Sequence, residues 1–110
     1  MEILTREEHG FTVVSVSGRL DAGTASDLEK DCANLINKGG TKLILELSAL
    51  EYVSSAGLRS VLAVAKKLKA AGGGLSLCGL TGLVQEVFSI AGFDSFLPVY
   101  ETVEKVVEKG

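Results

Sequence analysis

The feature that most constrains this fold is the regular alternation of short β-branched or leucine-rich segments with longer segments of helical periodicity. The extended segments are “MEILTRE”, “FTVVSVSG”, “KLILELS”, “LSLCG” and “FLPVY”. The helical segments are “TASDLEKDCANLINK”, the stretch between “SSAG” and “GGG”, “TGLVQEVFSIAG” and “TVEKVVEK”. Strands and helices that alternate in this way are joined by right-handed crossovers and form mostly parallel sheets. The sequence therefore predicts a single α/β domain, with a mixed, mostly parallel sheet of about five strands flanked by about four helices.

Apolar stripes and turn residues support the individual elements. The first three predicted helices carry, at helical spacing, Ala25, Leu28, Cys32, Leu35 and Ile36, then Leu58, Val61, Leu62, Ala65 and Leu68, then Leu83, Val84, Val87, Phe88 and Ala91. Thr24 and Asp27 resemble a capping box at the start of the first helix. In “KLILELS” the leucines alternate with other residues, so Ile44 is expected on the opposite face of a strand. His9 and Gly10 predict a hairpin turn between the first two strands.

Composition excludes several classes of partner. The 110 residues are 46% hydrophobic and 23% charged, which is typical of one globular domain. A net charge of −3, without a lysine or arginine cluster, gives no reason to expect nucleic acid or an anionic membrane surface. The N-terminus has no basic start followed by an apolar run, and no stretch reaches the ~20 apolar residues of a membrane-spanning helix. We expect a cytoplasmic protein without direct membrane insertion.

The sequence indicates neither a cofactor nor a metal. Cys32 and Cys78 lie far apart within apolar patterns, and His9 is the single histidine, so no zinc-binding set can be assembled. Buried, reduced thiols are the expected state of both cysteines. The three glycines at positions 72–74 follow a helix and precede a strand, which is the reverse of a phosphate-binding loop. They predict a helix end and a turn.

The stretch “YVSSAGLRSVL”, residues 52–62, places two serines at the start of a predicted helix. Serine is a favoured helix cap, because its side-chain oxygen accepts a hydrogen bond from a free amide of the first turn. Gly57 is unfavourable in a helix, and we interpret it as a bare turn that lets another molecule approach the hydroxyl. The positive end of the helix dipole would also favour a phosphate. A cap and a phosphorylation or anion site both remain open, whereas a nucleophilic serine enzyme is disfavoured because no Gly-x-Ser-x-Gly elbow is present.

Three collinear segments carry a resemblance to a known family. “LILELSALEYVSSAGLRSVLAVAKKLKAAGGGLSLCGL” resembles the central signature of the anti-sigma factor antagonists, the bacterial branch of STAS domains. “VVSVSGRLDAGTASDLEKD” is similar to the family's Gly-Arg/Glu-Leu/Ile-Asp strand end and first helix, and “VQEVFSIAGFDSFLPVYETVEKVV” to its closing segment. The resemblance covers essentially the whole chain and implies one STAS domain over residues 1–110.

The resemblance implies a regulatory binding module rather than an enzyme. In this family the anti-sigma factor is a serine kinase that phosphorylates its antagonist, and a PP2C-type phosphatase removes the phosphate. Unmodified antagonist binds the anti-sigma factor and frees the sigma factor, and phosphorylated antagonist does not bind. By position the acceptor is Ser55, with Ser54 as the second candidate. The residues expected to contribute to partner binding are Asp21, Thr24, Ser54, Ala56, Gly57 and Arg59.

The chain departs from the family pattern at the residue before the phosphorylated serine. The family has an acidic residue there, and this chain has Ser54; the family's Asp-Leu-Ser is Glu46-Leu47-Ser48 here. The missing carboxylate motivates a second hypothesis, in which the domain is a STAS scaffold or regulatory subunit of a lipid-transport complex or of a stress-sensing assembly. A third hypothesis, from another class, is an enzyme that uses Ser55 or a cysteine.

Overall fold

The computed structural model describes residues 1–109 and has a six-stranded mixed sheet with the order β1-β2-β3-β5-β6, in which β4 also pairs with β2. The strands are β1 (Glu2–Glu8), β2 (Phe11–Leu20), β3 (Lys42–Glu46), β4 (Leu50–Val53), β5 (Gly74–Cys78) and β6 (Val99–Tyr100). Only the β1–β2 pair is antiparallel among these strands. The predicted mixed, mostly parallel α/β domain is confirmed.

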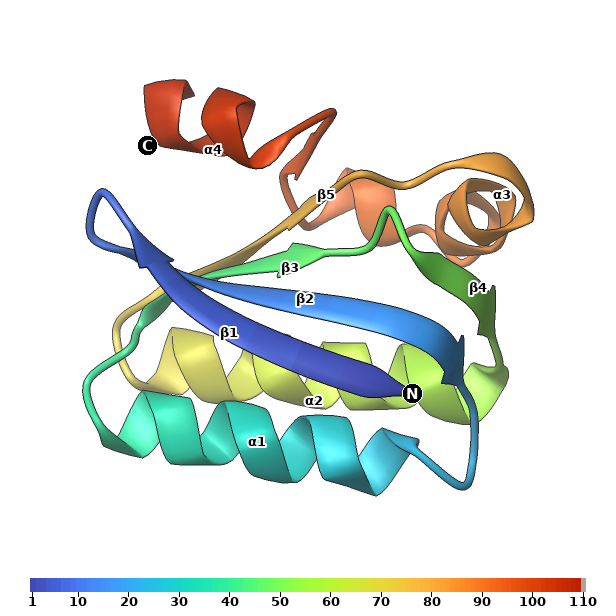
Figure 1. Cartoon of the computed structure of the whole chain (residues 1–110), viewed down its shortest axis with the longest axis horizontal. Helices are drawn as coiled ribbons and strands as arrows, with labels where there is room; N and C mark the ends of the chain where they lie inside the picture. Colours follow the sequence, from blue (N-terminus) through green and yellow to red (C-terminus); the bar gives the residue numbers. More distant parts are fainter. Residues whose placement is uncertain (110) are drawn as a thin grey trace.

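Helices cover both faces of this sheet. They are α1 (Ala25–Asn37), α2 (Ser55–Ala70), α3 (Gly82–Ile90) and α4 (Val103–Lys109), with a short 3₁₀ helix, η1 (Phe93–Ser95), after α3. Figure 1 shows α1 and α2 side by side beneath one face of the sheet, with α4 above the other face and α3 beside β4. None of the helices within the described residues is long and apolar enough to cross a bilayer.

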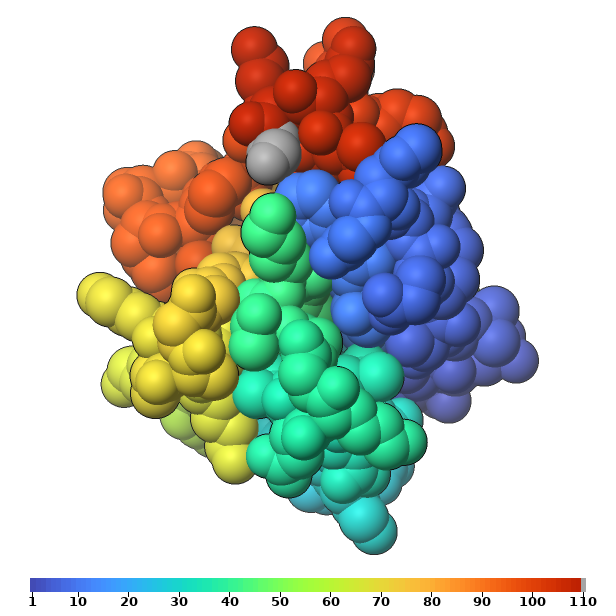
Figure 2. Space-filling model, turned by 90° about the vertical axis from the view of Figure 1, so that its left-hand side faces the viewer, coloured from blue at the N-terminus to red at the C-terminus, as the bar shows by residue number. Residues whose placement is uncertain are grey.

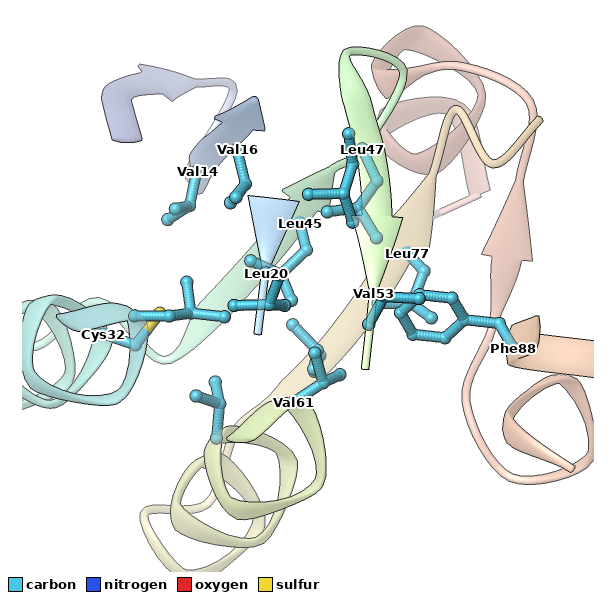
Figure 3. Close-up of a cluster of buried hydrophobic side chains, with 14 of the residues drawn as sticks. Val14, Val16, Leu20, Cys32, Leu45, Leu47, Val53, Val61, Leu77 and Phe88 are labelled. Carbon is cyan, nitrogen blue, oxygen red and sulfur yellow. The ribbon is translucent and has the colours of Figure 1, made fainter. Parts of the chain in front are cut away.

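The main core fills the space between the sheet and α1 and α2. Figure 3 shows Val14, Val16, Leu45 and Leu77 from the strands pointing toward Cys32 of α1 and Val61 of α2, with Phe88 of α3 closing one side. A second cluster lies on the other face and consists of Phe11, Val13, Ile44, Cys78, Val103 and Val106. Because β2, β3 and β5 are buried on both faces, their sequences are nearly continuous apolar runs. Ile44 does face away from the leucines, as predicted, and it is buried beneath α4.

The β1–β2 hairpin forms as predicted, through a turn in which His9 and Gly10 have φ angles of 49° and 85°. Positive φ at both central residues matches the right-handed twist of the flanking strands, and glycine adopts it without steric cost. The turn therefore fixes the register that pairs Glu8 with Phe11.

The structure refines the predicted fold at one strand and at one helix. The sheet has a sixth strand, β4, because the residues before Ser54 continue along β2 after a turn at Ser48 and Ala49. The predicted stripe of α3 is also too wide: Val84 and Phe88 are buried, but Leu83 is 76% exposed. This helix lies at the edge of the domain and buries only a narrow face.

Candidate functional site

The two serines lie where the carboxyl ends of two parallel strands meet. β2 and β4 run in the same direction, so the loop after β2 and the start of α2 lie at the same edge of the sheet (Figure 1). The Ser54 N–H donates a hydrogen bond of 2.9 Å to the Leu20 carbonyl and joins the two segments. Asp21 and Ser55 each directly follow one of these bonded residues, so the fold brings them to one surface.

We call the residues exposed here the α2-start surface, and they are Arg19, Asp21, Tyr52, Ser54, Ser55, Ala56 and Arg59. Asp21, Ser54, Ala56 and Arg59 are predicted partner-binding residues that are exposed or half-buried. Ser55 and Arg59 lie four residues apart on α2 and therefore share one face of the helix. Among residues 1–109, no carboxylate forms an ion pair with Arg59. Its guanidinium is available to an incoming anion.

The structure distinguishes the two serines. Ser54 is the N-cap of α2: its backbone is extended, with φ −96° and ψ 174°, and its Oγ accepts a hydrogen bond of 3.2 Å from the Gly57 N–H. Ser55 is the first residue of the helix, is exposed, and its hydroxyl has no hydrogen-bond partner within the described part of the chain. One serine caps the helix, and the other presents an unused hydroxyl at the helix start.

Gly57 has a different role from the one its sequence position indicates. It is buried, and a Cβ atom there would lie 2.6 Å from the Leu20 carbonyl oxygen, 2.9 Å from Leu20 Cγ and 3.0 Å from Val53 Cγ2. The interpretation of Gly57 as a bare turn open to a partner is therefore wrong. Glycine is required here because α2 packs directly against the end of β2, and this contact sets the position of the α2-start surface.

A network of local hydrogen bonds holds the loop that carries Asp21. The Thr24 hydroxyl accepts a hydrogen bond of 2.9 Å from the Asp21 N–H and donates one of 2.9 Å to the Arg19 carbonyl. Asp21 Oδ1 accepts a hydrogen bond from the Gly23 N–H at 3.0 Å. Because its hydroxyl is used in this turn, Thr24 makes no side-chain cap for α1, and the predicted capping box with Asp27 is wrong. Thr24 positions Asp21 instead.

Arg19 and Tyr52 belong to the surface although the sequence analysis did not select them. They are paired across the β2–β4 ladder, and the Arg19 Cζ lies 4.1 Å from the centroid of the Tyr52 ring. Arg19 Nε also lies 3.7 Å from Asp21 Oδ2. The tyrosine is 41% exposed, so the stacked pair adds an aromatic and cationic patch to the α2-start surface. Only the register between β2 and β4 reveals this pair.

The cap assignment predicts a difference between two alanine substitutions. Ser54→Ala removes the acceptor for the Gly57 N–H and is expected to lower the free energy of unfolding by about 1 kcal/mol. Ser55→Ala is expected to change it by less than about 0.5 kcal/mol, because the Ser55 hydroxyl has no partner and alanine favours a helix. Urea denaturation of both variants measures the difference. Equal effects would contradict the assignment of Ser54 as the cap.

The two cysteines and the single histidine do not belong to the α2-start surface. Cys32 and Cys78 are free and buried, as predicted, and burial raises the pKa of both thiols to about 12, so neither is a thiolate near neutral pH. His9 sits in the β1–β2 turn, which lies on the side of the molecule away from the start of α2 (Figure 1). The described residues contain no group of three or more side chains able to hold a metal ion. The α2-start surface therefore exposes the Ser55 hydroxyl, and neither cysteine nor the histidine belongs to it.

Comparisons with known proteins agree with this geometry. A family model of the STAS domain matches residues 2–106. BtrV of Bordetella bronchiseptica, named as an anti-sigma factor antagonist, is 39% identical over 104 residues, which cover 94% of this chain and 90% of BtrV. The crystal structure of an anti-sigma factor antagonist from Mycobacterium paratuberculosis superposes with a TM-score of 0.88 at 28% identity, covering 98% of this chain and 92% of that one. The Bacillus cell fate determinant SpoIIAA in its phosphorylated form shares the fold, with a TM-score of 0.70, 19% identity and 98% of each chain covered.

Proposed function

The chain belongs to the STAS domain family, and we propose that it is an anti-sigma factor antagonist whose binding to an anti-sigma factor is controlled by phosphorylation of Ser55. The resemblance seen in the sequence is confirmed by the family match and by relatives that carry this name over nearly the whole chain. In this proposal the anti-sigma factor is also the serine kinase, and a PP2C-type phosphatase restores the unmodified form. The output is a difference in binding affinity, not catalysis by this chain.

The observation that carries the proposal is the division of roles between the two serines. A kinase needs a hydroxyl that is exposed and not already used, and Ser55 meets both requirements. The Ser54 hydroxyl is half-buried and bonded to the Gly57 amide, so its phosphorylation would disrupt the first turn of α2. The geometry therefore favours Ser55 over the second candidate, Ser54.

The same cap accounts for the departure from the family pattern. Aspartate and serine are both favoured N-cap residues, because each offers a side-chain oxygen to the amides of the first turn. Ser54 therefore keeps the structural role of the family's acidic residue and removes one negative charge beside Ser55. Phosphorylation then places its charge in a less negative environment than it would beside an aspartate.

The folded chain accommodates a phosphate on Ser55. A phosphate adds about −1.5 to −2 charges at pH 7, and the N-terminal end of a 16-residue helix stabilises negative charge. Arg59, on the same face, supplies a cation for pairing. In the free protein the phosphate is therefore solvated and partly neutralised.

In a close interface the same phosphate acts against binding. The proposed partner surface comprises the exposed and half-buried residues Asp21, Ser54, Ser55, Ala56 and Arg59, with Thr24 and Gly57 positioning them from beneath. A phosphate at its centre loses solvation when a partner covers it, and Asp21 adds charge of the same sign. Unmodified and modified forms thus differ in affinity without any change of fold.

Displacement of a sigma factor tests this function. Adding the unmodified chain to a complex of the cognate anti-sigma factor and its sigma factor is expected to release the sigma factor, as followed by size-exclusion chromatography. Absence of release, together with co-purification of transporter subunits or of a large multiprotein assembly, would favour the scaffold hypothesis. Hydrolytic activity that depends on Ser55 would favour the enzyme hypothesis.

A further inference from the structure

An open groove of about 680 Å³ lies beside β5, toward the C-terminal end of α2. Leu62 and Ala65 of α2 form one wall, and residues 96–98 form the facing wall. Figure 2 shows this end of the molecule, with the end of α2 and the loop after it in yellow and the segment around residue 96 in orange. The volume falls within the ~300–1,000 Å³ range of small-molecule pockets, and the walls are mostly apolar. Phe96, on the rim, is 52% exposed.

Three cations line this apolar groove. Lys42, Lys66 and Lys69 all border it, and within residues 1–109 none of them forms an ion pair with a carboxylate. The Lys42 Nζ lies 5.3 Å from the centroid of the Phe11 ring, which also lines the groove. In a chain of net charge −3, this local excess of positive charge is opposite in sign to the whole. Apolar walls with unpaired cations fit a ligand with a hydrocarbon body and an anionic head.

The edge of β5 favours such a ligand over a peptide. The Leu77 N–H donates to the Pro98 carbonyl at 2.9 Å, and Pro98, which has no N–H, ends the ladder there. The Leu75 N–H points to the same edge, because alternate residues of a parallel strand bond to the same side, and it has no backbone partner in the described chain. The Gly73 N–H is already bonded to Leu68. A peptide added as a strand at this edge would therefore form backbone hydrogen bonds only with Leu75. A carboxylate needs only one such donor, and the Leu75 N–H can supply it.

We propose that this groove binds a fatty carboxylate. The hydrocarbon tail lies between α2 and residues 96–98, and the carboxylate lies among Lys42, Lys66 and Lys69, within reach of the Leu75 N–H. This site is separate from the α2-start surface. Binding of a fatty carboxylate can be measured without an anti-sigma factor. The result is therefore independent of the function proposed above.

Gly74 allows the groove to be filled without strain in the backbone. It lines the groove, its φ angle lies outside the left-handed region, and a Cβ atom there would meet no heavy atom within 4 Å. Gly74 is paired with Lys42 across the β3–β5 ladder, so Gly74→Phe places an aromatic ring on the Lys42 side of the groove, where the carboxylate is proposed to lie. Unchanged circular dichroism and an unchanged melting temperature would verify that this variant is folded.

Calorimetric titration with sodium laurate, below its micelle concentration, tests the proposal. We expect one laurate per chain, and at least tenfold weaker binding of dodecyltrimethylammonium, which has the same tail and the opposite charge. The combined variant Lys42→Gln, Lys66→Gln and Lys69→Gln is expected to lower laurate affinity at least tenfold, and Gly74→Phe to abolish binding. Lys67→Gln, a neighbouring exposed lysine outside this groove, is the matched control and is expected to leave affinity unchanged.

Three results would overturn the proposal. They are equal binding of the two amphiphiles, laurate binding that persists in Gly74→Phe, and binding of an acidic peptide at the groove without binding of laurate. If the triple lysine variant fails to fold, the comparison between the wild-type chain and Gly74→Phe decides the question.

Discussion

Replacing Ser55 with aspartate is expected to weaken binding to the anti-sigma factor by about 100-fold, which corresponds to about 3 kcal/mol. Ser55 is exposed at the start of α2, at the centre of the proposed partner surface. A carboxylate there must give up its solvation when the partner covers it, and Asp21 nearby carries the same charge. Isothermal titration calorimetry with the unphosphorylated partner measures the change in dissociation constant.

The same substitution has a second expected effect, which separates a loss of contact from a loss of folding. A negative charge in the first turn of a helix stabilises it by about 0.3–1 kcal/mol, so Ser55→Asp is expected to be at least as stable as the wild-type chain. Ser55→Asn, similar in shape but uncharged, is the matched control and is expected to retain binding to within about tenfold. Wild-type affinity in Ser55→Asp would contradict a charge-controlled interface.

Replacing Gly57 with alanine is expected to lower the free energy of unfolding by about 2–3 kcal/mol, because the added methyl group overpacks the contact between α2 and β2. The nearest atom is the Leu20 carbonyl oxygen, 2.6 Å from the new Cβ, and a backbone atom cannot move aside as the end of a side chain can. Helix propensity alone predicts the opposite sign, since alanine is favoured over glycine by about 1 kcal/mol. The sign of the change therefore distinguishes tight packing from an open turn.

Gly74→Ala is the matched control for this experiment. A methyl group at Gly74 meets no atom within 4 Å, and its φ angle is accessible to alanine. Its expected effect is a change of less than about 1 kcal/mol, in the stabilising direction, through the lower entropy of the unfolded chain. Urea denaturation of both variants gives the comparison, and Gly57→Ala as stable as Gly74→Ala would show that α2 does not pack closely on Leu20.

The main helices were predictable because they are long enough to display their periodicity. α1 and α2 carry apolar stripes over 13 and 16 residues, and both end close to glycines. β4 has four residues, of which only Leu50 and Val53 are buried, and this is too short for an alternating pattern to be recognised. Its position follows from pairing with β2, which is a tertiary property.

The place of the candidate site in the fold was predictable from the sequence, but the roles of its individual residues were not. The helix start, both serines and Asp21 follow from local patterns and from the resemblance to the family. Which serine caps the helix depends on a single hydrogen bond to Gly57, and the reason for the glycine depends on its contact with Leu20. The Ser54–Gly57 bond spans only three residues, but the sequence leaves open which serine is the cap until the start of α2 is known, and the contact with Leu20 joins segments far apart in the sequence. Both features therefore required the packed structure.

The central claim, that Ser55 is the phosphorylated residue of a partner switch, is tested most directly by mapping phosphate after incubation with the cognate anti-sigma kinase and ATP. Tandem mass spectrometry of the product is expected to find one phosphate, on Ser55, with Ser54 unmodified. The Ser55→Ala chain, treated in parallel, is expected to remain unmodified. Phosphate on Ser54, or no phosphate on a chain that binds the kinase, would contradict the account.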